Sequence, residues 1–327
     1  MALSAQALQY VDEALTDLTS QPDPGDQDLS MPWLRRVSVP APASKGEVVV
    51  WRELINASSV GVSTARAPGH ARNQIFLGDP ATVSYQTNER SLDIFLDYME
   101  IGRAQAPLDV QTMAARKVRR VVELNRYKAC RDLVTTTANW GANNNATIAA
   151  LGGSGVNLSN AASTPMVDFE LGAQACAEQN GNRRPDYLIL SDRAVNLMIA
   201  VGLRNVLPLD QAPVREIRQQ NAIDALADHL GIEVFVERGF ENGSRLWPAT
   251  AVFGYRAGTV TPTNNGAIVP PITAALIQEQ VPNYISGDIV MAVREKEDAT
   301  GLVISCITSD APLAVDTEAI YLVTSLY

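Results

Sequence analysis

The chain has 327 residues, 46% of them hydrophobic and 19% charged, so it can bury a large core in one large domain or two closely packed ones. Its formal net charge of -10 argues against a chain-wide positive surface for nucleic acid or acidic membrane. Three widely spaced cysteines (Cys130, Cys176 and Cys306) without a CxxC pair argue against a disulfide framework or a zinc cluster. We find no secretory leader and no apolar run of membrane-spanning length, and therefore expect a soluble protein in a reducing cytoplasm.

The first part of the chain predicts extensions more than a packed core. Residues 5–18 have the apolar spacing of a short amphipathic helix. Residues 31–42 contain three prolines, which favour an arm lying on a surface. Residues 46–55 and 76–85 read as two strands, and the polar run 56–74 between them has too few apolar residues to be buried. These strands therefore predict a protruding hairpin.

A strand and then a long helix follow the hairpin. Residues 91–98 (SLDIFLDY) alternate polar and apolar side chains, as a half-buried strand does. Pro107 and Asp109 supply helix-start chemistry, and neither proline nor glycine interrupts the chain from there to Ala138. A helix of about 30 residues is about 45 Å long, well above the usual length in a globular domain. This length predicts a strut that holds an extended plate together, not an active-site scaffold.

The remainder of the chain mixes helical and strand patterns. Residues 140–164 are rich in Asn, Gly, Ser and Ala and read as a flexible connection. Helices are predicted at residues 167–178, 192–201 and 222–230. Strands are predicted at residues 184–191, 232–237, 251–255, 274–279, 288–295 and 302–308. Because these strands and helices do not strictly alternate, the sequence predicts an α+β fold.

No group of residues has the pattern of a catalytic, cofactor-binding or metal site. His70 and His229 have no partner nearby in the sequence, and Cys176 has the setting of a small core residue. The glycine cluster at residues 151–155 lacks the Lys-Ser/Thr pair of a phosphate loop and reads as a linker. The acidic residues at 295–298 fit a solvated turn between two strands. We therefore expect a protein that is not an enzyme and that binds no cofactor or metal.

The long helix carries the one sharp electrostatic pattern of the sequence. On a helical wheel one face holds Arg116, Arg119, Arg120, Glu123 and Arg126. The opposite face is mostly apolar and holds Val110, Ala114, Val118, Val121 and Leu124. Arg119 and Glu123 are spaced for an ion pair within the helix. Two interpretations stay open: a solvated helix face, or a face that meets acidic groups of neighbouring chains or phosphates of packed nucleic acid.

In this order the segments resemble the major capsid protein of tailed bacteriophages, the Hong Kong 97-type fold. The similarity lies in LDIFLDYMEIGRAQAPLDVQTMAARKVRRVVELNRYKACRDLVTT and RRPDYLILSDRAVNLM, with LADHLGIEVFVERG and ATAVFGYRAG in support. The similarity covers nearly the whole chain, and it lies in the order of the segments and their residue patterns more than in invariant motifs. The resemblance implies an α+β capsid fold with these regions: an N-terminal arm (1–44), an extended β-hairpin loop (45–90), a peripheral domain with a long spine helix (91–165), an axial domain (166–270) and closing strands that return to the peripheral domain (271–327).

The same resemblance implies a structural major capsid protein. Such a protein self-assembles as hexamers and pentamers into the icosahedral head shell of a virion around double-stranded DNA, after synthesis in a host cytoplasm. The five residues of the arginine face then become candidates for contacts between subunits. The implied partners are further copies of the chain, a portal protein, scaffolding or decoration proteins, and packaged double-stranded DNA bound without sequence preference, but no membrane. The arm and the hairpin tip are expected to order only on assembly.

Two other classes of protein stay open. An encapsulin-type nanocompartment shares the fold but packages protein cargo, and its shell is recovered without DNA. An enzyme with an unfamiliar site would require a cleft with convergent titratable groups, for which the sequence offers few candidates. No long charged segment precedes the arm, so we expect the removable built-in scaffold of some capsid proteins to be absent.

Overall fold

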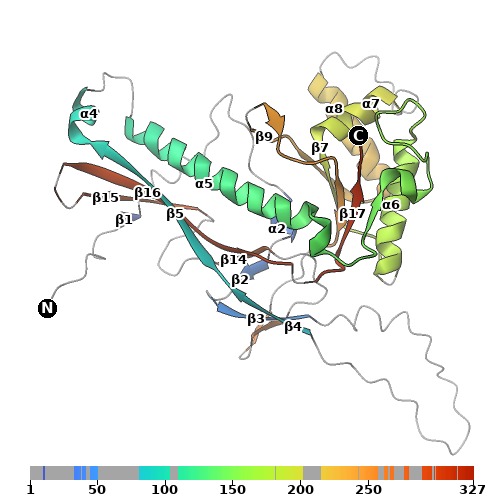
Figure 1. The fold of residues 1–327 in the computed structure, drawn as a ribbon, viewed down its shortest axis with the longest axis horizontal. Coiled ribbons are helices and arrows are strands. Elements are labelled where there is room, and N and C mark those ends of the chain that lie inside the picture. Colours follow the sequence, from blue (N-terminus) through green and yellow to red (C-terminus); the bar gives the residue numbers. More distant parts are fainter. Residues whose placement is uncertain are drawn as a thin grey trace, which may run out of the picture.

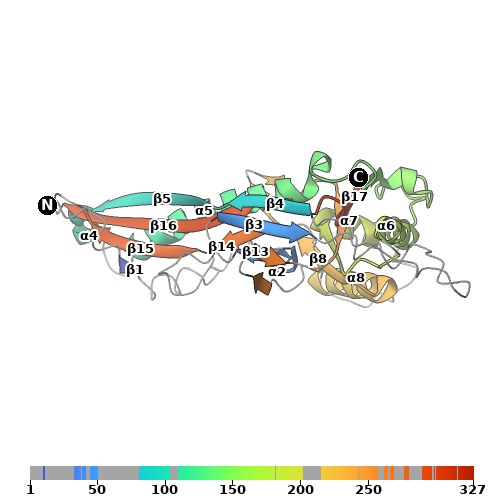
Figure 2. The same cartoon turned by 90° about the horizontal axis from the view of Figure 1, so that it is seen from below.

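The computed structural model describes residues 10–11, 33–37, 39–41, 45–50, 81–103, 110–180, 182–201, 215–241, 243–256, 261–263, 266–268, 276–279, 289–296, 298, 300–314 and 316–327. They form a mixed α+β fold in which two main sheets are joined by one long helix (Figure 1). In the perpendicular view the described elements make a long, flat molecule (Figure 2). The α+β class predicted from the sequence is confirmed.

A five-stranded sheet forms the centre of one end of the molecule. In spatial order its strands are β6 (Asn145–Thr147), β17 (Ile320–Thr324), β11 (Ala251–Gly254), β7 (Tyr187–Ser191) and β8 (Glu233–Glu237). One face is covered by α6 (Pro165–Gln179), α7 (Asp192–Val201) and α8 (Arg215–Leu230). Leu188 and Leu190 of β7 belong to the core under these helices, whereas Tyr187 and Ile189 belong to the core on the opposite face. Burial on both faces explains why β7 reads as a continuous apolar run.

A six-stranded sheet forms the other end, with β16 (Gly301–Pro312) at its centre. Its other strands are β5 (Asn88–Asp97), β15 (Val290–Glu295), β14 (Leu276–Glu279), β1 (Tyr10–Val11) and β2 (Val39–Ala41). β5 pairs with one side of β16, and β15 and β14 pair with the other. β1 then pairs with β15, so Tyr10 and Val11 form a strand where the sequence predicted a helix. Pairing along a sheet edge outweighs a weak local helix preference.

The predicted hairpin begins with a regular antiparallel pair. β3 (Lys45–Val50) pairs with β4 (Ala81–Gln86), and β13 (Gly266–Ile268) joins β3 in parallel, with β12 (Thr261–Thr263) at the edge. The pairing that the sequence predicted is therefore confirmed at the base of the hairpin. Its polar tip, with His70, lies outside the described residues.

Helix α5 (Val110–Thr135) lies where the long helix was predicted, and its 26 residues make it about 39 Å long. Its N-terminal half packs on the six-stranded sheet, where Val118 and Val122 share a core with β15 and β16. Its C-terminal half packs on the five-stranded sheet, where Tyr127 and Cys130 belong to a second core. α5 therefore connects two hydrophobic cores, as expected of a strut.

The connection after α5 is ordered, which corrects the prediction of a flexible segment. It contains the short helices η1 (Thr137–Asn139) and η2 (Ile148–Leu151) and the strand β6. The buried carboxylate of Asp168 accepts hydrogen bonds from the backbone N–H of Ser154 at 2.7 Å and from its hydroxyl at 2.8 Å. A Cβ on Gly153 would lie 2.1 Å from Asp168 Oδ1, so this close approach requires glycine. The glycine cluster is held by a carboxylate of the chain itself.

We expect Asp168→Ala to lower the free energy of unfolding by about 1–3 kcal/mol, because the N–H and hydroxyl of Ser154 would lose their buried acceptor. Urea unfolding followed by circular dichroism measures this loss. Asp132 is a matched control, since 60% of its side chain is exposed. Asp132→Ala should change the stability by about 0.5 kcal/mol or less. An equal loss in both variants would contradict the role of Asp168.

One segment of the arm packs inside the molecule. The short helix α2 (Leu34–Val37) and the preceding Trp33 fit between α5 and the five-stranded sheet. Trp33 and Val37 are both 0% exposed. This corrects the expectation that the whole arm orders only on assembly, because residues 33–37 already bury their apolar side chains within one chain.

Candidate subunit-contact surface

The predicted arginine face lies on α5, and its five residues have different surroundings. Arg116 and Arg120 are half-buried. Arg119 donates to Glu123 at 2.7 Å, which confirms the pair predicted from their spacing. Arg126 is buried and has only 4% of its surface exposed. The five residues therefore do not form one solvated face.

The helical-wheel prediction is wrong for Arg126 because the buried stripe of α5 winds around the helix. The stripe recurs at every fourth position, at Ala114, Val118, Val122, Arg126, Cys130 and Val134. Each four-residue step rotates it by about 40°, which sums to about 200° over its length. The stripe rotates because the two halves of α5 pack on two different sheets. Val121, predicted on the apolar face, is exposed for the same reason.

Arg119 lies close to the sheet beneath α5. Burial raises the pKa of the Cys306 thiol on β16 to about 12, and the nearby Arg119 guanidinium opposes this rise. Only 14% of the Arg119 side chain is exposed. Arg119 and Glu123 therefore pair with each other within the subunit.

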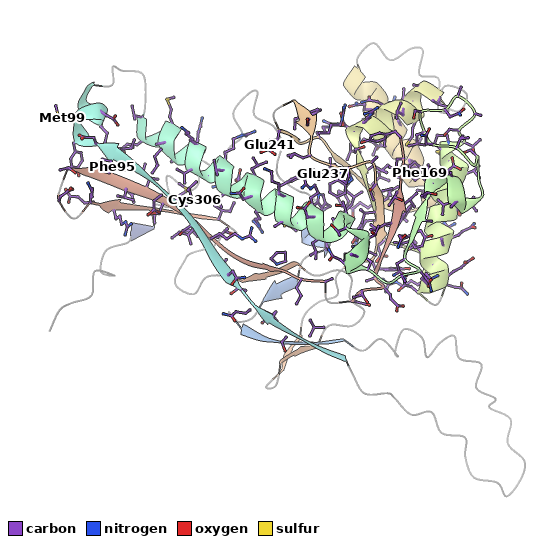
Figure 3. The ribbon with its side chains drawn as sticks, viewed as in Figure 1. Phe95, Met99, Phe169, Glu237, Glu241 and Cys306 are labelled. Atoms are coloured by element: carbon purple, nitrogen blue, oxygen red, sulfur yellow. The ribbon has the colours of Figure 1, made fainter. Side chains whose placement is uncertain are left out.

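A group of exposed apolar side chains at the outer end of the six-stranded sheet is missing from the sequence predictions. It comprises Phe95 at the end of β5 and Tyr98 and Met99 in α4 (Tyr98–Arg103), which are 43%, 42% and 62% exposed. Figure 3 shows Phe95 and Met99 at this end of the molecule. The signal in the sequence was Phe95, which breaks the alternation of the strand pattern. Exposed apolar side chains that gather in one place mark sites of interaction.

The remaining candidates have structural roles. Cys176 is fully buried in the core, as predicted, and burial raises the pKa of its thiol to about 12. His229 is exposed near the end of α8, before Gly231 with its positive φ of 67°. Asp298 lies in the turn between β15 and β16, where it accepts from Thr300 and pairs with Lys296. Among the described residues no His, Cys, Asp and Glu cluster has the arrangement of a metal site, and no described helix is long and apolar enough to cross a membrane.

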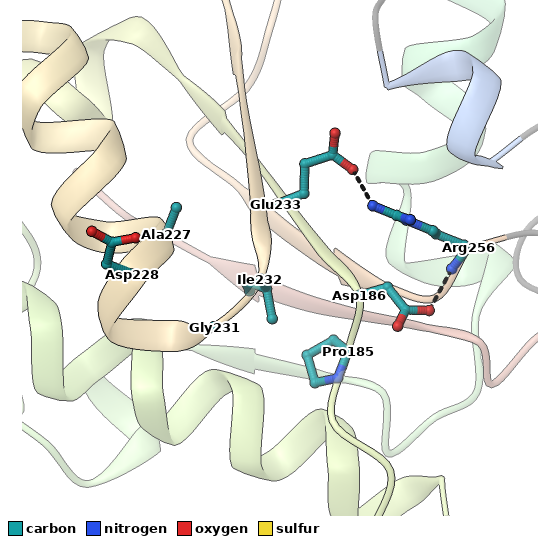
Figure 4. Close-up of a pocket in the computed structure, with 8 residues that line it drawn as sticks. All are labelled: Pro185, Asp186, Ala227, Asp228, Gly231, Ile232, Glu233 and Arg256. Carbon is teal, nitrogen blue, oxygen red and sulfur yellow. Dashed lines mark hydrogen bonds and ion pairs between the residues drawn. The ribbon is translucent and has the colours of Figure 1, made fainter.

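An open depression of about 490 Å³ lies beside the start of β8 (Figure 4). Two of its carboxylates, Asp186 and Glu233, are engaged by arginines. Arg256 donates its backbone N–H to Asp186 at 2.9 Å and its guanidinium to Glu233 at 2.9 Å. Burial opposes ionisation of Glu233, but hydrogen bonds from Arg36 and Arg256 outweigh it and hold its pKa below the ordinary value. This geometry fits ion pairs that fasten surface elements together.

Comparison with solved structures finds the same fold in several proteins. A phage-related protein from Bordetella bronchiseptica RB50 superposes with a TM-score of 0.64 at 18% identity, over 98% of each chain. The capsid protein of cyanophage P-SCSP1u matches with a TM-score of 0.51 at 10% identity, over 94% of this chain and 93% of the other. The capsid of Myoviridae phage XM1 gives a TM-score of 0.51 at 10% identity, over 99% of each chain. No protein-family model and no curated protein matches the sequence.

These matches define the class of fold. The chain has the α+β fold of phage capsid proteins, which confirms the resemblance seen in the sequence. The match extends over nearly the whole chain.

Proposed function

We propose that this chain is the major capsid protein of a tailed bacteriophage and that it forms the head shell. The observation that carries the proposal is the full-length fold match to phage capsid proteins. The flat shape and the long helix α5 support it. A subunit that tiles a closed surface must keep its shape while it contacts its neighbours, and a helix that connects both cores stiffens it. The proposal includes no catalytic activity, and it places the protein in the virion after assembly in a host cytoplasm.

Within this proposal, each region of the chain has a part in the shell. Residues 1–44 form the arm, 45–90 the extended hairpin loop, 91–165 the peripheral domain with α5 as its spine, 166–270 the axial domain, and 271–327 the closing strands. Hexamers and pentamers of the chain form the closed surface around double-stranded DNA. A portal protein and scaffolding or decoration proteins are the further partners.

We also propose where neighbouring subunits meet. Arg116 and Arg120 provide positive charge on a half-buried part of α5, suited to acidic groups of a neighbour. Phe95 and Met99 provide exposed apolar surface at the outer end of the six-stranded sheet, which a neighbouring subunit would cover. Together they give the subunit both the charged and the apolar components of a specific interface.

The purified protein is expected to assemble into closed shells that negative-stain electron microscopy resolves directly. Light scattering should show species far larger than the 35.2 kDa chain. A compact monomer under every assembly condition tested would contradict the proposal. The contents of the shells decide between the two shell-forming classes: shells that package DNA support a capsid, whereas shells that carry protein cargo and never DNA support the encapsulin-type alternative.

A further inference from the structure

One buried carboxylate connects three distant parts of the chain. Glu237, at the end of β8, is 4% exposed. Its Oε1 accepts a hydrogen bond from the indole Nε1 of Trp33, 204 residues earlier, and its Oε2 accepts one from the Tyr127 hydroxyl on α5 at 2.8 Å. Burial raises the pKa of Tyr127 well above its ordinary value and Glu237 raises it further, so the hydroxyl stays protonated and donates. Figure 3 shows Glu237 beside α5.

The arm segment is bound along the whole of β8. The Trp33 ring meets Trp247 edge-on, with centroids 5.7 Å apart and planes at 70°. Arg36, one turn later in the arm, donates to Glu233 at 3.1 Å. Side chains alternate along a strand, so Glu233 and Glu237 point to the same face of β8 as Phe235, which packs against the same core as Trp33. The segment therefore has a polar attachment at each end and an apolar contact between them.

The Trp33 side chain lies in a slot formed by Tyr127 of α5, Glu237 of β8 and Trp247. The walls of this slot are held in place by contacts that do not involve the arm. Lys128 of α5 pairs at 2.7 Å with Glu241 of β9 (Phe240–Glu241), which pairs with β10 (Ser244–Arg245). Arg131 of α5 donates to the Leu246 carbonyl at 2.9 Å, and the Trp247 indole donates to the Thr250 carbonyl at 2.9 Å. These contacts fix α5 and Trp247 relative to each other, so the slot has supports that do not depend on the arm.

The arm segment itself is too short to hold its shape alone. α2 has four residues. An isolated helix of that length is unstable, because its few hydrogen bonds do not offset the conformational entropy lost when the first turn forms. Its backbone bonds run from Arg36 and Val37 N–H to the Trp33 carbonyl, at 2.8 and 3.2 Å. Tertiary contacts with the slot therefore stabilise the helical conformation of residues 34–37.

We propose that Tyr127, Glu237 and Trp247 form a binding site for the arm segment 33–37, and that this segment is a latch that binds there as a peptide ligand binds its receptor. The latch fastens the arm to the junction between α5 and the five-stranded sheet. Glu237 accepts from both Trp33 and Tyr127, so the latch and α5 share one carboxylate of β8. This inference concerns the single subunit and does not depend on shell formation.

A peptide tests the binding site in the full-length, unassembled chain. A fluorescently labelled peptide of residues 31–41 is added to the Trp33→Ala chain, whose slot has lost its own indole, and binding is followed by anisotropy. We expect this chain to bind the peptide roughly tenfold or more tightly than the wild-type chain does, because the wild-type slot is already occupied. A peptide carrying the Trp33→Ala change should not bind. The Trp140→Ala chain is the matched control, since it loses a buried tryptophan of the same core but keeps the slot filled.

Failure of the peptide to bind the Trp33→Ala chain, or equal binding to all three chains, would overturn the proposal. A second variant covers the case in which Trp33→Ala does not fold. Arg36 is 40% exposed at its side chain, so Arg36→Glu removes the pair with Glu233 without opening the core. Hydrogen exchange of the amides at residues 34–37 should then accelerate by roughly tenfold. Arg183→Glu, at a residue with 43% side-chain exposure that pairs with Asp186, is the control and should leave those amides unchanged. Unchanged exchange in Arg36→Glu would also overturn the proposal.

Discussion

The double variant Arg116→Glu, Arg120→Glu is expected to form no closed shells, with or without DNA. If these arginines meet acidic groups of a neighbour, each reversal places like charges at every copy of the interface, at a cost on the order of several kcal/mol per contact. Arg116 and Arg120 are the residues to test, because both are half-buried members of the arginine face and lie one turn apart on α5. Negative-stain microscopy of the purified variant under assembly conditions gives the result.

Two controls separate a contact from other effects. Lys117→Glu reverses one positive charge at an exposed position in the same turn of α5, with half of the net-charge change of the double variant, and shells should still form. Urea unfolding of the double variant should give a subunit as cooperative as the wild type. Normal empty shells from the double variant would refute the contact role. If those shells then failed to retain DNA in a salt-dependent way, the arginines would instead face the packaged genome.

The second large effect is expected in the core of the five-stranded sheet. Phe253→Ala should lower the free energy of unfolding by about 3–5 kcal/mol, because it removes a fully buried ring and leaves a cavity. Phe253 lies on β11 between two neighbouring strands, and its ring centroid is 6.5 Å from that of Phe169 on α6. Gly172 of α6 packs directly against the Phe253 ring, since an added Cβ would lie 2.8 Å from it, and it has no side chain to fill the space that the ring leaves. Chemical denaturation of the unassembled chain measures the loss.

Val167→Ala is the control for this prediction. Val167 also lies on α6 but is 51% exposed, so its truncation should cost about 0.5 kcal/mol or less. Equal losses in the two variants, or a loss below about 1 kcal/mol for Phe253→Ala, would show that the packing around β11 relaxes to close the cavity.

Local patterns in the sequence were sufficient for most helices and strands. The run YLILS predicted a buried strand, and the uninterrupted pattern after Asp109 predicted a long helix, found as α5. Some bounds shifted: α8 begins at Arg215, about two helical turns before the predicted start at residue 222. These features depend on neighbours in the sequence, whose spacing sets which side chains share a face.

Features that depend on distant contacts were predicted less well. The wheel for α5 assumed one buried face, but the helix meets two sheets and its buried stripe rotates, so Arg126 is buried. The segment 140–164 looked flexible because its small polar residues give no periodic pattern, yet Asp168 holds Ser154. Trp33 looked like part of a loose arm, because nothing near it in the sequence indicates a slot.

The sequence by itself determined the α+β class, the long helix, the hairpin base and the order of elements that resembles a phage capsid protein. Only the tertiary structure decided which arginines of α5 stay near the surface, where exposed apolar residues gather, and how Trp33 docks. The reason is physical: a helix or strand follows from the spacing of residues a few positions apart, whereas burial and pairing depend on groups such as Trp33 and Glu237, 204 residues apart, that meet only when the chain has folded.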